Sequence, residues 1–157
     1  MNHPQNAHLE DVASRASGSD VMKILVGIDG SSHSYDTLKY AISEAKIKKA
    51  KLTAVLSRHD VKTGEETIRD REFLEKAKKM MQDEGIEADV HLLVRGFSSA
   101  VDIVKFAEEN GYDHIIVGSH GISGITRILL GSVADEVVRK VHCPVTVFRK
   151  YYKRARI

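Results

Sequence analysis

Short apolar runs that alternate with segments of helical period constrain the fold of this chain more than any other feature. Such runs, rich in β-branched residues and apolar at consecutive positions, are typical of strands covered on both faces of a parallel sheet. Five of them occur along the chain: KILVGID (23–29), LTAVL (52–56), DVHLLV (89–94), DHIIVG (113–118) and PVTVF (144–148).

The segments between these runs carry apolar residues at helical spacing. Their stripes are Tyr35, Leu38, Ala41, Ile42 and Ala45; Phe73, Leu74, Ala77, Met80 and Met81; Val101, Val104 and Ala107; and Val133, Val137, Val138 and Val141. Ser99 with Asp102 resembles a capping box, and Gly85 and Gly111 occupy positions expected for helix C-caps. The pattern predicts a doubly wound α/β domain, an open sheet of five parallel strands with helices on both faces.

The composition narrows the function classes. The chain has 157 residues, of which 42% are hydrophobic and 29% charged, and this favours one globular domain. A net charge of +2 excludes a broad electrostatic footprint for nucleic acid, and no apolar run reaches transmembrane length. The single cysteine, Cys143, excludes an intrachain disulfide and suits a reducing compartment. We therefore predict a cytoplasmic protein that binds neither nucleic acid nor membrane.

The two ends of the chain differ from its middle. Residues 1–21 have no hydrophobic period and no signal-peptide core, so we expect a disordered leader there. Met22 opens MKILVGIDGS, which has the form of a natural start, and the leader could therefore derive from a vector. The domain is predicted to span 22–150, followed by a basic, solvated tail over 151–157.

A glycine-rich loop follows the fourth predicted strand. It reads VGSHGISGITRILLGS (117–132), with four of the chain's eleven glycines and no lysine, so it is not a P-loop. In doubly wound folds the ligand crevice lies at the carboxyl ends of the strands, where the strand order reverses. If the first and fourth strands are neighbours there, Asp29 and this loop face one crevice. The first amides of a helix beginning at Ser132 could then hold a phosphate, and Arg127 is the only full positive charge in the loop.

Two simpler interpretations stay open on the residues alone. Ser132 can be the N-cap of its helix, with Asp135 completing a capping box. Asp29 can be an Asx-turn residue that follows its strand. Neither interpretation needs a ligand.

The spacing Gly118-x2-Gly121-x9-Gly131-Ser132 resembles the ATP-binding signature of the universal stress proteins. The segments ILVGIDGS, DHIIVGSHG and LLGSVADEVVRKVHCPVTV also resemble that family, so the likeness covers the chain from Met22 to Arg149. The resemblance implies a fold of the adenine-nucleotide alpha-hydrolase type that binds ATP or another adenine nucleotide, together with Mg²⁺. It also implies a homodimer through the last strand, 144–148, and a protein partner that the sequence does not identify.

The resemblance further assigns roles by position. Asp29 is expected to contact the ribose and to help place the metal. The adenine contact is expected near Ser57, where the strand end reads VLSRHD and many family members read close to LHVV, so that Arg58 can add a polar contact or fill part of the pocket. The other expected contacts are Gly27 and Ile28 in the pocket wall, Val117 and Gly118 beside the adenosine, and Gly121, Gly131, Ser132 and Val133 at the phosphates.

Two classes of adenine-binding enzyme with similar topology are disfavoured. One carries S-G-G-x-D-S after the first strand, where this chain reads DGSSHS, and the other carries H-x-G-H, which SHGISG lacks. Transfer chemistry also needs charge stabilisation at the transferring phosphate, and this loop offers amides, one arginine and at most a metal. We predict a nucleotide-dependent regulatory protein of the stress response that acts through ligand occupancy. The alternatives are a slow ATP-hydrolysing enzyme and a partner-binding module with a vestigial pocket.

Overall fold

A five-stranded parallel sheet forms the centre of the computed structural model, which describes residues 21–60, 63–94, 96–119 and 130–150. The strand order is β3-β2-β1-β4-β5, and every neighbouring pair is parallel. The strands are β1 (Lys23–Ile28), β2 (Lys51–Arg58), β3 (Ala88–Val94), β4 (His114–Gly118) and β5 (Val145–Phe148). The predicted fold class is confirmed.

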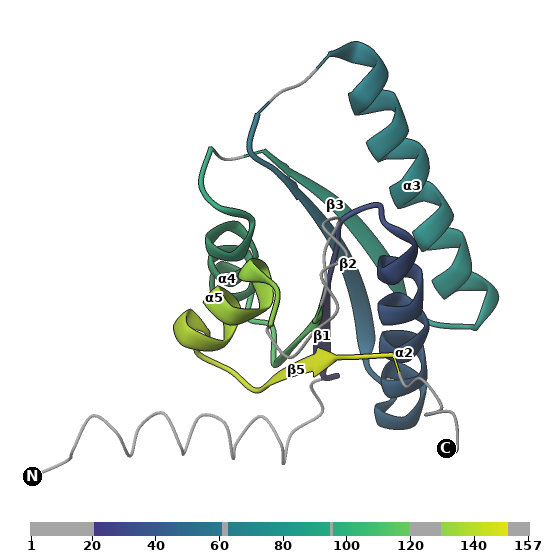
Figure 1. Ribbon diagram of the computed structural model, residues 1–157. Helices are drawn as coiled ribbons and strands as arrows, with labels where there is room; N and C mark the ends of the chain where they lie inside the picture. The colour runs from purple at the N-terminus through teal and green to yellow at the C-terminus, as the bar shows by residue number, and fades with distance from the viewer. Residues whose placement is uncertain (1–20, 61–62, 95, 120–129, 151–157) are drawn as a thin grey trace, which may run out of the picture.

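Helices cover both faces of this sheet (Figure 1). On one face lie α2 (Ser32–Lys48) and α3 (Gly64–Asp83), and on the other lie α4 (Ser99–Glu109) and α5 (Ser132–Lys140). Successive residues of β1 alternate between the two cores, with Ile24 and Val26 toward α2 and α3 and Leu25 toward α4 and α5. Burial on both faces explains why the strands are apolar at consecutive positions.

The helix ends follow local chemistry. Ser31 caps α2, where its hydroxyl accepts a hydrogen bond from the Ser34 amide at 3.3 Å. Gly85 and Gly111 follow α3 and α4 with φ of 74° and 65°, which confirms them as glycines that end helices in the left-handed region. Lys49 ends α2 with a φ of 51°, a conformation that the sequence did not predict.

Several sequence predictions about the helices are wrong in detail. The N-cap of α4 is Ser98 rather than Ser99, and Asp102 is fully buried instead of completing a capping box. The N-cap of α5 is Gly131, so the alternative in which Ser132 caps this helix does not hold. Val138 of the predicted apolar stripe is 43% exposed, because α5 turns only Ala134 and Val137 fully into the core.

The strand order reverses between β1 and β4, as the sequence argument required. β1 pairs with both β2 and β4, so the two chain segments that leave β1 and β4 emerge side by side. Strand β2 continues beyond the predicted LTAVL and includes Ser57 and Arg58, which brings both residues to the same end of the sheet. Of the helices in the described residues, none combines the length and apolarity that a membrane crossing requires.

The two edges of the sheet are β5 and β3. All four residues of β5 are half-buried, and β5 crosses the front of the view in Figure 1. In β3 the side chains of Val90 and Leu92 are partly buried against the core.

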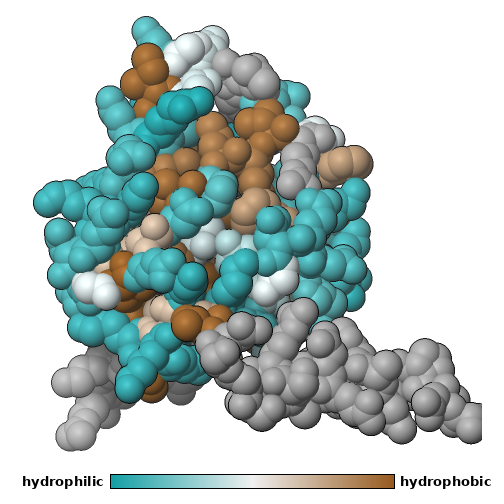
Figure 2. Space-filling model, turned by 180° about the vertical axis from the view of Figure 1, so that it is seen from behind, coloured by the Kyte–Doolittle hydropathy of each residue, from teal (hydrophilic) through white to brown (hydrophobic). Residues whose placement is uncertain are grey.

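The surface of the molecule seen from behind carries hydrophobic side chains toward its middle and hydrophilic ones around them (Figure 2).

Candidate functional site

A pocket of about 260 Å³ opens at the carboxyl ends of β1, β2 and β4, where the strand order reverses. Polar and small residues make up much of its wall. The lining residues are Gly27, Ile28, Asp29, Ser34, Thr37, Ser57, Arg58, Ser99, Ile103, Val117, Gly118, Gly131, Ser132, Val133 and Ala134. The position agrees with the general rule that ligands of doubly wound folds bind at the reversal point.

The structure brings together all the predicted site residues that it describes. Gly27, Ile28, Asp29, Ser57, Val117, Gly118, Gly131, Ser132 and Val133 line this one pocket. The predicted contacts Gly121 and Arg127 lie outside the described residues. Sequence reasoning missed Ser34, Thr37, Ser99, Ile103 and Ala134 as lining residues, because it followed motif positions and not the helix faces beside them.

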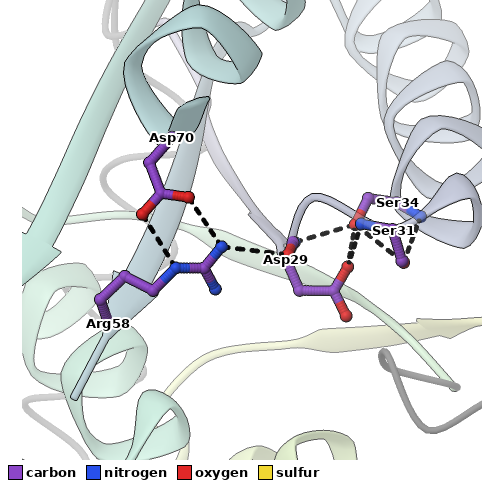
Figure 3. Close-up of polar contacts among 5 residues, drawn as sticks. All are labelled: Asp29, Ser31, Ser34, Arg58 and Asp70. Carbon is purple, nitrogen blue, oxygen red and sulfur yellow. Dashed lines mark hydrogen bonds and ion pairs between the residues drawn. The ribbon is translucent and has the colours of Figure 1, made fainter. Parts of the chain in front are cut away.

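Asp29 lies at the turn between β1 and α2 (Figure 3). Its Oδ1 accepts a hydrogen bond from the Ser31 amide at 2.9 Å and another from the Ser34 hydroxyl, while its own amide donates to Ser34 Oγ at 2.8 Å. The Asx-turn interpretation is therefore correct, and Asp29 lines the pocket as well. Among the described residues, Oδ2 has no hydrogen-bond partner, so a turn residue here still presents an oxygen for a ligand or a metal.

Arg58 closes the neighbouring part of the wall (Figure 3). Its Nε and Nη2 donate to the two carboxylate oxygens of Asp70 on α3 at 2.9 and 2.8 Å, a bidentate pair. Nη2 also donates to the Asp29 carbonyl oxygen at 3.4 Å. The guanidinium thus ties α3 to the turn after β1, and its charge is already paired within the protein.

The N-terminus of α5 forms the opposite wall. Its N-cap, Gly131, has φ −58° and ψ 155°, and this glycine has no side chain with which to cap the first amides of the helix. The first turn of a helix carries unpaired N–H groups and a partial positive charge. Because Ser132, Val133 and Ala134 line the pocket, this end of the helix can hold an anionic group without a lysine.

The β2 end of the pocket contains a buried polar pair. Ser57, which is 7% exposed, donates a hydrogen bond from Oγ to Asp102 Oδ2 at 2.7 Å. Asp102 is completely buried, and its Oδ1 has no hydrogen-bond partner among the described residues. Sequence reasoning missed this pair, because it interpreted Asp102 as part of a capping box with Ser99.

A divalent metal would have few protein ligands at this site. Within the described residues, no group of three or more His, Cys, Asp or Glu side chains could hold a metal ion. Mg²⁺, however, is commonly bound through one or two carboxylates together with phosphate oxygens and water. A single carboxylate such as Asp29 therefore fits Mg²⁺ only when a phosphate-bearing ligand supplies the other oxygens.

The fold and the pocket define a doubly wound α/β protein with a ligand site at the strand reversal. The model of the universal stress protein family matches residues 21–149, and the chain belongs to this family. A universal stress protein of Methanocaldococcus jannaschii is 34% identical over 141 residues, which cover 82% of each chain.

Two solved structures extend the comparison to ligands. The universal stress protein of Archaeoglobus fulgidus in complex with dAMP is 31% identical and covers 82% of this chain and 98% of that one, with a TM-score of 0.69. A universal stress protein in complex with cAMP is 25% identical and covers 83% and 98% of the two chains, with a TM-score of 0.67. Nucleotide binding therefore occurs among the structural neighbours of this chain.

Proposed function

We propose that this protein binds ATP, or a related adenine nucleotide, in the pocket at the strand reversal and acts as a cytoplasmic regulator through occupancy of that pocket. The observation that carries the proposal is the N-terminus of α5, where the N-cap Gly131 has no capping side chain and which lines the same pocket as the turn at Asp29. The dAMP and cAMP complexes of its structural neighbours support an adenine nucleotide as the ligand.

The pocket wall suggests an orientation for the nucleotide. Phosphates would bind the first amides of α5 and the hydroxyl of Ser132, where the helix dipole favours negative charge. Asp29 Oδ2 would contact the ribose or Mg²⁺, since Oδ1 is held in the turn. The base would then lie across β1, toward Ser57 at the end of β2. Contacts from Gly121 and Arg127 remain predictions.

The pocket is better suited to holding a nucleotide than to hydrolysing it. Asp29 is the only carboxylate among the described lining residues, and Arg58 is already paired with Asp70. No described lining residue is a histidine, and the Asp29 carboxylate is assigned to the ribose or Mg²⁺, so no described lining residue is left to act as a general base for water. Occupancy, and not turnover, would change the surface that a protein partner meets.

Two measurements on the full chain test this function. Mass spectrometry of ligand released from freshly purified protein should find an adenine nucleotide, and calorimetry on ligand-free protein should give a saturable heat with ATP and Mg²⁺. Steady-state phosphate release should be slow. The absence of both bound nucleotide and saturable heat would contradict the proposal and favour a partner-binding module, and rapid turnover would favour an ATPase.

We also propose that two copies pair through β5, the strand predicted over 144–148. The carbonyl oxygens of Pro144 and Phe148 accept hydrogen bonds from the β4 side, at 3.0 and 2.8 Å. Because backbone groups alternate along a strand, those of Val145 and Val147 point to the open edge. An apolar open edge invites pairing with a second chain, and twofold pairing closes the assembly.

The edge geometry supplies a selective test of this dimer. Val147→Pro removes an outward amide and leaves the hydrogen bonds to β4 in place, since proline is tolerated on edge strands. Thr146→Lys is less suitable, because Thr146 Oγ1 lies 2.8 Å from His114 Nε2 within the chain. Sedimentation should show a dimer for the parent and a folded monomer for Val147→Pro. A parent that sediments as a monomer at micromolar concentration would contradict this proposal.

A further inference from the structure

Asp102 is a buried carboxylate that the stability of the fold does not explain. It is fully buried on α4, one oxygen accepts the Ser57 hydroxyl hydrogen, and the other has no donor among the described residues. A buried carboxylate with so few hydrogen bonds costs free energy, and an apolar residue of similar volume is often no worse for stability. Such a group therefore calls for a functional explanation.

The position of Asp102 links it to the pocket. Ser99 and Ile103, which flank it on α4, both line the pocket, and so does its partner Ser57. Asp102 lies in the first turn of α4, and its Oδ2 accepts the hydrogen of the Ser57 hydroxyl at 2.7 Å. A serine hydroxyl has only one hydrogen to donate. The hydrogen of the Ser57 hydroxyl is therefore committed to Asp102.

The hydrogen bond from Ser57 to Asp102 decides whether this part of the pocket wall can donate or accept a hydrogen bond. A serine hydroxyl has one hydrogen and two lone pairs, so Ser57 offers only acceptor lone pairs to a ligand once its hydrogen is used. We propose that Asp102 is a positioning residue that makes Ser57 a hydrogen-bond acceptor, so that this end of the pocket selects a base with an amino group over one with a carbonyl group. The inference rests on the proposed function, because it needs a nucleotide whose base lies at the β2 end.

The chemistry distinguishes adenine from hypoxanthine. Adenine carries an exocyclic amine that can donate to Ser57 Oγ, whereas hypoxanthine carries a carbonyl oxygen whose lone pairs would oppose those of Ser57. Leaving a buried acceptor without its donor costs about the free energy of one unsatisfied hydrogen bond. We expect ATP to bind about tenfold or more tightly than ITP.

The test compares the ratio of ATP and ITP affinities by calorimetry in three variants of the full chain. Asp102→Asn keeps the shape, but its amide can donate to Ser57 and release the hydroxyl hydrogen, so the ratio should fall toward one. Ser57→Ala removes the acceptor and should lower the ratio as well, which keeps the inference testable if Asp102→Asn does not fold. Ser98→Ala is the matched control, because it weakens the N-terminal end of α4 without touching the Ser57–Asp102 bond and should keep the parent ratio.

The outcomes separate this inference from the proposed function. A parent that binds ATP and ITP equally overturns the role of Ser57 and Asp102 and leaves nucleotide binding standing. A parent that binds ATP selectively, with the ratio unchanged in folded Asp102→Asn and Ser57→Ala, overturns it too. A parent that binds neither nucleotide overturns both. A lowered ratio in both site variants, with the parent ratio kept in Ser98→Ala, supports the inference.

Discussion

Replacing Gly131 with aspartate should raise the stability of the protein and lower its affinity for ATP at the same time. The φ and ψ of Gly131, −58° and 155°, are nearly those of the capping residue Ser98, −63° and 151°. Aspartate therefore fits this backbone without strain, and its carboxylate can accept a hydrogen bond from the first turn of α5. The same amides are the ones that would hold phosphate.

The two effects have different sizes. An aspartate N-cap is worth only a few tenths of a kcal/mol over glycine, so the free energy of unfolding should rise slightly. A carboxylate at about 5 Å from a phosphate charge is repelled by about 3 kcal/mol at an effective dielectric constant of about 20. Solvent and Mg²⁺ reduce this repulsion. We expect Gly131→Asp to bind ATP about tenfold to a hundredfold more weakly, about 1.4 to 2.7 kcal/mol.

Calorimetric titration with ATP and Mg²⁺ measures the affinity, and chemical denaturation without nucleotide measures the stability. Gly131→Asn is the matched control, because it can cap the helix without adding a charge and should lose much less affinity. Unchanged affinity in a folded Gly131→Asp would remove the α5 N-terminus from the site. Equal losses in the two variants would refute the electrostatic reasoning and leave only a steric effect.

Three further predictions concern single side chains. Asp29→Asn retains the hydrogen-bond acceptor of the turn but lacks the charge. Calorimetry with Mg²⁺ should therefore show weaker ATP binding than in the parent, and the loss of affinity should be smaller when Mg²⁺ is withheld. Equal affinities of parent and variant under both conditions would mean that Asp29 is a turn residue only. Burial raises the pKa of Cys143 to about 11. Because the thiolate is the reactive form, iodoacetamide at about pH 8 should alkylate Cys143 roughly a hundredfold more slowly than a small free thiol. An equal rate would show that the thiolate is accessible. Burial lowers the pKa of His114 below 6.5 in the folded state. As the pH falls, the His114 side chain is therefore protonated in the unfolded chain before it is protonated in the folded protein. The folded state loses stability as the pH falls below about 6.5 for this reason. Denaturation between about pH 8 and about pH 5 should therefore show a smaller loss for His114→Gln than for the parent.

The strands and their order of appearance could be predicted because burial on both faces leaves a strong local signal. In β1, Ile24, Leu25 and Val26 are all fully buried, and no amphipathic pattern competes with that run. The pocket could be located for a similar reason, since the reversal of strand order follows from the topology and the glycines mark the loop there. The bidentate pair of Arg58 with Asp70 could not be predicted, because it joins β2 to a helix whose rotation the sequence does not give.

The misreading of Asp102 has a specific physical origin. The sequence analysis placed the apolar stripe of α4 on Val101, Val104 and Ala107, but the structure buries a different set: Ala100, Ile103, Val104, Phe106 and Ala107. At 100° per residue, the centres of the two stripes differ by roughly 70° around the helix.

That rotation brings Asp102 from the side opposite the predicted stripe to the edge of the buried arc, next to Phe106. The larger side chains could have shown which face of α4 is buried. Ile103 and Phe106 have more apolar area than Val101, and a helix turns its largest apolar face inward. With the stripe drawn through them, an acidic residue falls at the edge of an otherwise apolar arc. A buried acidic side chain is more informative than an exposed apolar one, because it needs a hydrogen-bond partner. Here the partner is Ser57, a serine in the wall of the pocket.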